Sequence, residues 1–215
     1  MSHYQDQVHA IWAAWLQRDY TELKDAVRLA VTQDLSNMLV PPPGENFYGY
    51  SLYTCNGLLH IYAVLNTMPE RQDHIEREQD QYTHNCADEW RHCRQDGYFD
   101  PVNECLTALR EEFESLNDAF EDLEWDGVTT LDDDVDNYWE RHVERMFAAV
   151  LEALVELQKA GHFSDLEQAA SPLLMIWFSD ASVWEMEMIK ESVRRLNSEF
   201  VYEEFCAVFN HYGNN

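Results

Sequence analysis

Two runs of strand-forming residues on either side of Asn56-Gly57 constrain the fold of this chain more than any other feature. The runs read FYGYSLYTC and LLHIYAVLNT, and both are rich in aromatic and β-branched residues. Asn-Gly between such runs favours a type I′ turn, because both central residues of that turn need positive φ. The pattern therefore predicts an antiparallel hairpin made of residues 47–54 and 58–66.

The remaining elements follow from hydrophobic periodicity. The apolar run LLMIWF, residues 173–178, predicts a strand buried on both faces, which we place in the same sheet as the hairpin. Apolar residues at spacings of three and four predict helices over residues 8–35 (or two helices broken near 19–21), 70–95, 100–123, 132–161, 183–196 and 199–209. The expected fold is α+β, a small antiparallel or mixed sheet packed with amphipathic helices in a single domain, residues 1–215.

The charge balance narrows the possible partners. The chain of 215 residues carries 41 acidic and 14 basic side chains, a formal net charge of -27. Such a protein repels nucleic acid and anionic lipid and attracts basic proteins, so neither nucleic acid nor a membrane is an expected partner. No stretch approaches the length of uncharged apolar sequence that crosses a bilayer, and the N-terminus does not resemble a secretion signal. The five cysteines are odd in number and form no CxxC, as expected of reduced thiols in the cytoplasm.

The densest charge lies between residues 111 and 136, where twelve carboxylates occur without a single Lys or Arg. One interpretation is a solvated helix face followed by an acidic helix N-terminus. The other is a docking surface for a basic protein, with Trp125 as its aromatic anchor. The predicted partner-binding residues of that surface are Glu121, Asp122, Glu124, Trp125, Asp126, Asp132, Asp133, Asp134 and Asp136. A calcium loop is not expected, because an EF-hand alternates its ligands around a central Gly and ends in Glu.

Several potential metal ligands lie between residues 74 and 93. His74, His84, Cys86, His92 and Cys93 could ligate zinc, but their spacing fits no finger or ribbon. We therefore expect no metal and no cofactor. Cys93 is the best candidate nucleophile, although the carboxylates around it would raise the pKa of its thiol. GxSxG, HExxH, P-loop and GxGxxG motifs are all absent from the sequence, so an enzyme is not the favoured hypothesis.

Three segments together resemble a bacterial family of domains of unknown function, DUF4303. They are FYGYSLYT with the following strand that ends in LNT, then DGYFDPVNECL, and then LLMIWFSD followed by ESVRRLN, the most specific of them. The resemblance spans residues 5–205 in order. It implies an α+β cytosolic protein with no established enzymatic activity, whose relatives look like components of toxin and immunity gene neighbourhoods. The resemblance carries over no catalytic residues.

Two hypotheses of function follow. The first is an immunity- or antitoxin-like protein that neutralises a basic toxin or effector through its acidic surface. The alternative is an enzyme of unrecognised type, with its site near His84, His92 and Cys93.

Overall fold

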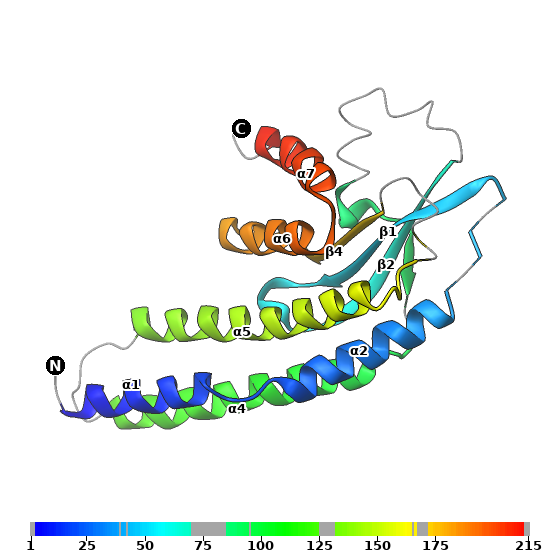
Figure 1. Cartoon of the computed structure of the whole chain (residues 1–215). Coiled ribbons are helices and arrows are strands. Elements are labelled where there is room, and N and C mark those ends of the chain that lie inside the picture. Colours follow the sequence, from blue (N-terminus) through cyan, green and yellow to red (C-terminus); the bar gives the residue numbers. More distant parts are fainter. Residues whose placement is uncertain are drawn as a thin grey trace.

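A mixed four-stranded sheet forms the centre of the molecule (Figure 1). The computed structural model describes residues 3–38, 40–41, 43–69, 85–94, 96–124, 132–164, 166 and 172–212. Its strands are β1 (Glu45–Thr54), β2 (Ile61–Pro69), β3 (His92–Arg94) and β4 (Leu173–Phe178). They lie in the order β3-β2-β1-β4, with β1 antiparallel to β2 and parallel to β4, and β2 antiparallel to β3. The α+β fold expected from the sequence is confirmed.

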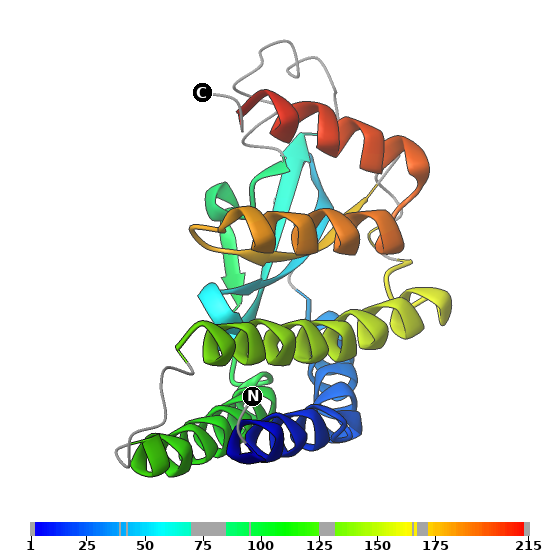
Figure 2. The same cartoon turned by 90° about the vertical axis from the view of Figure 1, so that its left-hand side faces the viewer.

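Helices lie on both sides of this sheet. They are α1 (His3–Leu16), α2 (Thr21–Ser36), α4 (Asp100–Glu124), α5 (Asp132–Lys159), α6 (Val183–Leu196) and α7 (Glu199–Tyr212). α1, α2, α4 and α5 gather on one side, and α6 and α7 lie on the other (Figures 1 and 2). Tyr50 of β1 donates a hydrogen bond to Asp34 of α2, whereas Trp177 of β4 packs on Phe209 of α7. Both faces of β1 and β4 are therefore covered, which agrees with the unbroken burial of residues 47–52 and 173–178.

Most of the predicted elements are confirmed. β1 and β2 pair as a hairpin, β4 belongs to the same sheet, and α4, α5, α6 and α7 occupy the segments predicted to be helical. The first helical segment is two helices, and the break falls at residues 17–20. Asp19 accepts hydrogen bonds from the backbone N–H and the hydroxyl of Thr21, at 2.9 and 2.6 Å. These bonds use donors at the start of α2 that no helical carbonyl can reach.

The connection of the hairpin differs from the prediction. Thr54 pairs with Ile61, so the connection is residues 55–60, with a 3₁₀ turn at Asn56–Leu58. The positive φ angles belong to Gly57 and Leu58, so the two-residue type I′ turn expected at Asn56-Gly57 is wrong. Leu58 is fully buried, and Glu185 of α6 accepts a hydrogen bond from the Gly57 N–H at 3.1 Å. Contacts with the rest of the molecule thus determine the turn.

The helix predicted over residues 70–95 is also wrong where it can be checked. Residues 70–84 lie outside the described part, but 87–89 form a single 3₁₀ turn and 92–94 form β3. The ring of Trp90 packs against Gly49 of β1, where a Cβ on the glycine would come within 2.6 Å of it. Arg94 is buried and binds Asp34 through Nε at 2.9 Å. Pairing with β2 and this buried ion pair outweigh the weak helical pattern of the segment.

A second, smaller core holds α1 in place. Trp12 is fully buried, stacks on Tyr138 of α5 at 5.1 Å between ring centroids, and lies 4.8 Å from the ring of Phe113 of α4. Leu16 completes this cluster. α1 is thereby fixed against α4 and α5, and the turn that follows it lies beside α4.

Candidate functional site

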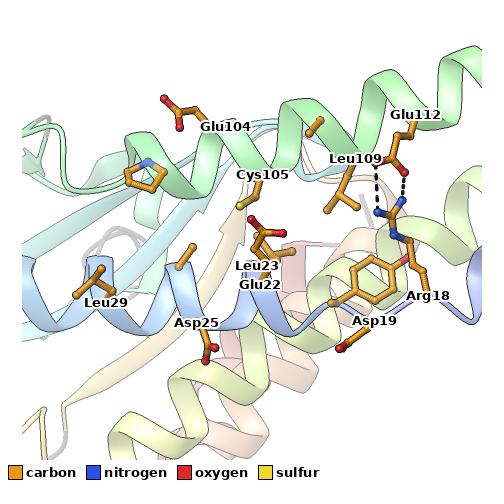
Figure 3. Close-up of a pocket in the computed structure, with 14 residues that line it drawn as sticks. Arg18, Asp19, Glu22, Leu23, Asp25, Leu29, Glu104, Cys105, Leu109 and Glu112 are labelled. Carbon is orange, nitrogen blue, oxygen red and sulfur yellow. Dashed lines mark hydrogen bonds and ion pairs between the residues drawn. The ribbon is translucent and has the colours of Figure 1, made fainter.

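A groove of about 560 Å³ runs between α2 and α4 (Figure 3). The two helices are antiparallel there, so that Leu29 and Pro101 lie at one end of the groove and Arg18 and Glu112 at the other. Its apolar lining comprises Leu23, Ala26, Leu29, Pro101, Cys105, Ala108 and Leu109. Ala26 and Ala108 are small, and Leu29 is 57% exposed. The groove thus presents uncovered apolar surface to the solvent.

Carboxylates surround this apolar lining. The acidic residues of the groove are Asp19, Glu22, Asp25, Glu104 and Glu112, and its single basic residue is Arg18. An excess of carboxylates around apolar walls concentrates negative potential in the groove, because the field is less screened next to low-dielectric surface. The groove therefore favours a cation.

Arg18 neutralises one end of the groove. Its guanidinium forms an ion pair with Glu112 and lies 5.4 Å from the ring centre of Trp15. The hydrogen bond from Arg18 holds the pKa of Glu112 below its usual value, which keeps the pair charged. Asp25, on the α2 rim, pairs with Arg28 at 3.2 Å. These carboxylates already have cationic partners within the chain.

Glu22 and Glu104 differ from them. In the part of the chain that the structure describes, neither carboxylate forms an ion pair with a basic side chain. Glu22 points from α2 toward Cys105, whereas Glu104 projects from α4 on the side away from α2 and lies at the rim of the groove (Figure 3). The pKa of Cys105 is raised, first by burial and then by the negative charges of Glu22 and Glu104. Both charges therefore act on the thiol in the middle of the groove. Asp19, near the Arg18 end, has no basic partner either among the described residues and instead accepts hydrogen bonds from Thr21.

Behind the groove lies a buried pair of titratable groups. The hydroxyl of Tyr20 is 2.9 Å from Nδ1 of His142, a fully buried residue that packs 4.4 Å from the ring of Trp15. Burial lowers the pKa of His142 to about 3 and raises that of Tyr20 to about 12. Within the described residues, Nε2 of His142 has no hydrogen-bond partner. A neutral histidine with no exposed surface does not exchange protons with a ligand in the groove, so we assign the pair a structural role.

Only part of the acidic stretch between residues 111 and 136 lies within the described residues. Glu111, Glu112, Glu114 and Asp118 are exposed on α4, and Glu112 also lines the groove. The nine predicted partner-binding residues follow farther along the chain. The side chains of Glu121, Asp122 and Glu124 in α4 and of Asp132, Asp133, Asp134 and Asp136 in α5 lie outside the described part, as do Trp125 and Asp126 altogether. Their role as a binding site stays a prediction.

The structure does not join the candidate catalytic residues into one site. His92 and Cys93 are neighbours on β3, and neighbouring side chains of a strand point to opposite faces of the sheet. Nε2 of His92 lies 3.4 Å from the hydroxyl of Thr67. His74 and His84 are outside the described residues. Among those that are described, no group of three or more His, Cys, Asp or Glu side chains is placed to hold a metal ion.

The segments that carry the family resemblance hold strands in place. Asn197, the last residue of ESVRRLN, bonds to both backbone groups of Leu174 at 2.8 and 2.7 Å, and Ser192 accepts from the N–H of Ile176 at 3.0 Å. Asn103 of DGYFDPVNECL bonds in the same way to both backbone groups of Ile61, at 2.8 and 3.1 Å. These side chains satisfy strand edges rather than forming a chemical site.

Sequence reasoning missed Arg18, Glu22 and Glu104. A partial signal exists, because residues 22, 25, 26 and 29 lie on one face of a helix and combine two acidic with two apolar side chains. That face forms one wall of a groove only because α2 packs antiparallel to α4.

Comparison with known proteins identifies one family. A family model described as a domain of unknown function (DUF4303) matches residues 23–198, which include α2 from Leu23 onward, α4, α5, α6 and the whole sheet. No curated protein and no solved structure matches the chain. In the described part of the chain, no helix combines the length and the apolar character needed to cross a membrane.

Proposed function

We propose that this protein, which belongs to the DUF4303 family of domains of unknown function, is an immunity- or antitoxin-like protein that acts in the cytoplasm and neutralises a basic toxin or effector protein by binding it. The observation that carries the proposal is the acidic, partly apolar groove between α2 and α4, which is continuous with the exposed carboxylates of α4.

The charge supports a protein partner of opposite sign. Glu111, Glu114 and Asp118 are exposed on α4 within two helical turns of Glu112, which lines the groove, and the chain as a whole has a net charge of -27. Negative charge of this density accelerates the approach of a basic protein over roughly 8 Å at physiological salt. Fast association is useful to an inhibitor that must capture a toxin before the toxin reaches its target.

The groove supports affinity as well as speed. Surface charge alone contributes little to the strength of a complex, since exposed ion pairs are screened. Binding energy comes mainly from a few buried anchors in well-packed pockets. The exposed apolar lining around Leu29, Ala26 and Ala108 offers such a pocket beside the charged surface.

Growth protection tests the proposal. Each toxin-like protein encoded next to the gene for this chain is expressed in a host bacterium with and without the chain. We expect the chain to restore growth against one of them, and to co-purify with it. Failure to protect against any of the neighbouring toxin-like proteins would contradict the proposal.

Matched variants then locate the protective surface. Glu111→Gln with Asp118→Asn removes two exposed charges from α4, and Glu203→Gln with Glu204→Gln removes two exposed charges from α7. The first variant is expected to protect less well than the second, which controls for net charge. Equal protection by both variants would show that α4 is not the binding surface.

A further inference from the structure

We propose that the groove between α2 and α4 binds a basic amphipathic helix of the partner protein, with a Lys or Arg side chain of that helix held at Glu22 and Glu104. The proposal rests on the proposed function for the identity of the partner as a toxin. The preference of the groove for a basic helix can be measured independently of that identity.

The shape of the groove fits a helix. Its lining extends from Arg18 to Leu29 along one wall and from Pro101 to Glu112 along the other, about three helical turns or roughly 16 Å on each. Two antiparallel helices bound it over this length. A third helix laid along such a groove presents side chains at spacings of three, four and seven residues to both walls.

The lining fits the apolar face of such a helix. Ala26 and Ala108 have the smallest side chains of the groove and allow close approach of another backbone. Leu29 is 57% exposed and Cys105 is partly buried, so both would lose solvent contact beneath an apolar side chain. Covering this surface removes apolar area from water, which favours binding.

The charges specify where the basic residue lies. Arg18 at one end pairs with Glu112, and Arg28 pairs with Asp25 at the rim, so those carboxylates have cations of their own. Glu22 and Glu104 have no such partner within the described part, and both act on Cys105 between them. A Lys or Arg side chain lying over Cys105 would neutralise the central charges, with its aliphatic stem on the apolar lining.

A synthetic peptide tests the preference directly. The probe is a fluorescein-labelled amphipathic helix of about 18 residues, long enough to form a helix, with Leu on one face and Lys beside it. Fluorescence anisotropy measures its binding to the full chain. Glu22→Gln with Glu104→Gln is expected to weaken binding about tenfold, and Glu203→Gln with Glu204→Gln on α7 to leave it within about twofold. The same peptide with Glu in place of Lys should not bind.

A second variant separates shape from charge. Ala108→Trp fills the groove from an exposed position on α4 and leaves every charge in place. It should weaken peptide binding at least as much as the loss of Glu22 and Glu104. If Ala108→Trp binds the peptide normally, or if the α7 variant weakens binding as much as the groove variant, the peptide binds by net charge alone and the proposal is wrong.

Different results would refute the groove as the binding site and the immunity function. Groove variants that lose the peptide but still protect cells would refute the groove as the toxin site, while leaving the immunity function standing. Normal peptide binding at the groove, together with no protection against any neighbouring toxin, would refute the immunity function alone.

Discussion

His142 is a neutral, fully buried side chain whose surroundings are mostly aromatic, apart from the Tyr20 hydroxyl 2.9 Å from its Nδ1. Trp15, Phe113 and Trp139 surround its ring, at centroid distances of 4.4, 5.9 and 5.7 Å. Because burial lowers its pKa from 6.5 to about 3, the unfolded chain binds a proton between those pH values that the folded chain does not. The contribution of His142 is therefore fully present above pH 6.5 and is lost as the pH falls toward 3.

We expect acid to destabilise the protein through this residue. The loss should reach roughly 3 kcal/mol by about pH 4, at 1.36 kcal/mol for each pH unit below the unfolded pKa. Urea unfolding measured from pH 7 to pH 4 checks this for the wild type and for His142→Phe, which cannot titrate. The difference between the two proteins isolates the histidine from the many carboxylates that protonate in the same range. A constant difference across that range would show that His142 is not buried as described.

At the scale of elements, polar side chains take the place of a neighbouring strand at one edge of the sheet. β4 is an edge strand, and its outward backbone groups at Leu174 and Ile176 are bound by Asn197 and Ser192. An uncovered strand edge invites pairing with other chains. The ESVRRLN segment thus places one end of α6 and the residue after it along the exposed edge of the sheet.

Asn197→Ala should therefore both destabilise the fold and promote aggregation. Two partly buried hydrogen bonds to β4 are lost, which costs about 1–3 kcal/mol. Chemical unfolding measures the stability, and light scattering on warming measures the aggregation. Arg195→Ala, an exposed change in the same segment, serves as the control and should have little effect on either. If the two variants behave alike, the amide contacts with Leu174 do not stabilise β4.

At the scale of the whole molecule, the carboxylates of the predicted acidic surface and its aromatic anchor, Trp125, lead to different kinetic predictions. Neutralising Asp122, Glu124, Asp132 and Asp134 to the corresponding amides should slow association with the toxin found by growth protection, as added salt does, because screened attraction acts mainly on the association rate. Trp125→Ala should instead speed dissociation, as loss of an anchor does. Stopped-flow measurements at low and physiological salt distinguish the two effects. An unchanged association rate in the neutralised variant would leave these residues as a solvated surface.

Local pattern alone predicted much of the molecule. The hairpin strands, β4 and the helices from α4 to α7 could be placed from the sequence. Each of them buries apolar residues, and the spacing of those residues can be read within the segment itself. The family resemblance was equally local, since it depends on short segments that hold strand edges. The excess of acidic residues, and hence the preference for a basic partner, also followed from the sequence.

Only the tertiary structure decided the rest. Residues 92–94 form a strand because Arg94 meets Asp34, 60 residues earlier in the chain, and because β2 offers a free edge. The groove exists because α2 and α4 lie antiparallel and Arg18 reaches Glu112 across 94 residues. Such contacts produce no hydrophobic period in the sequence around either residue. Their free energy depends instead on which distant segments the fold brings together. The sequence therefore predicts a basic partner, whereas the arrangement of the helices creates the groove in which we propose that this partner binds.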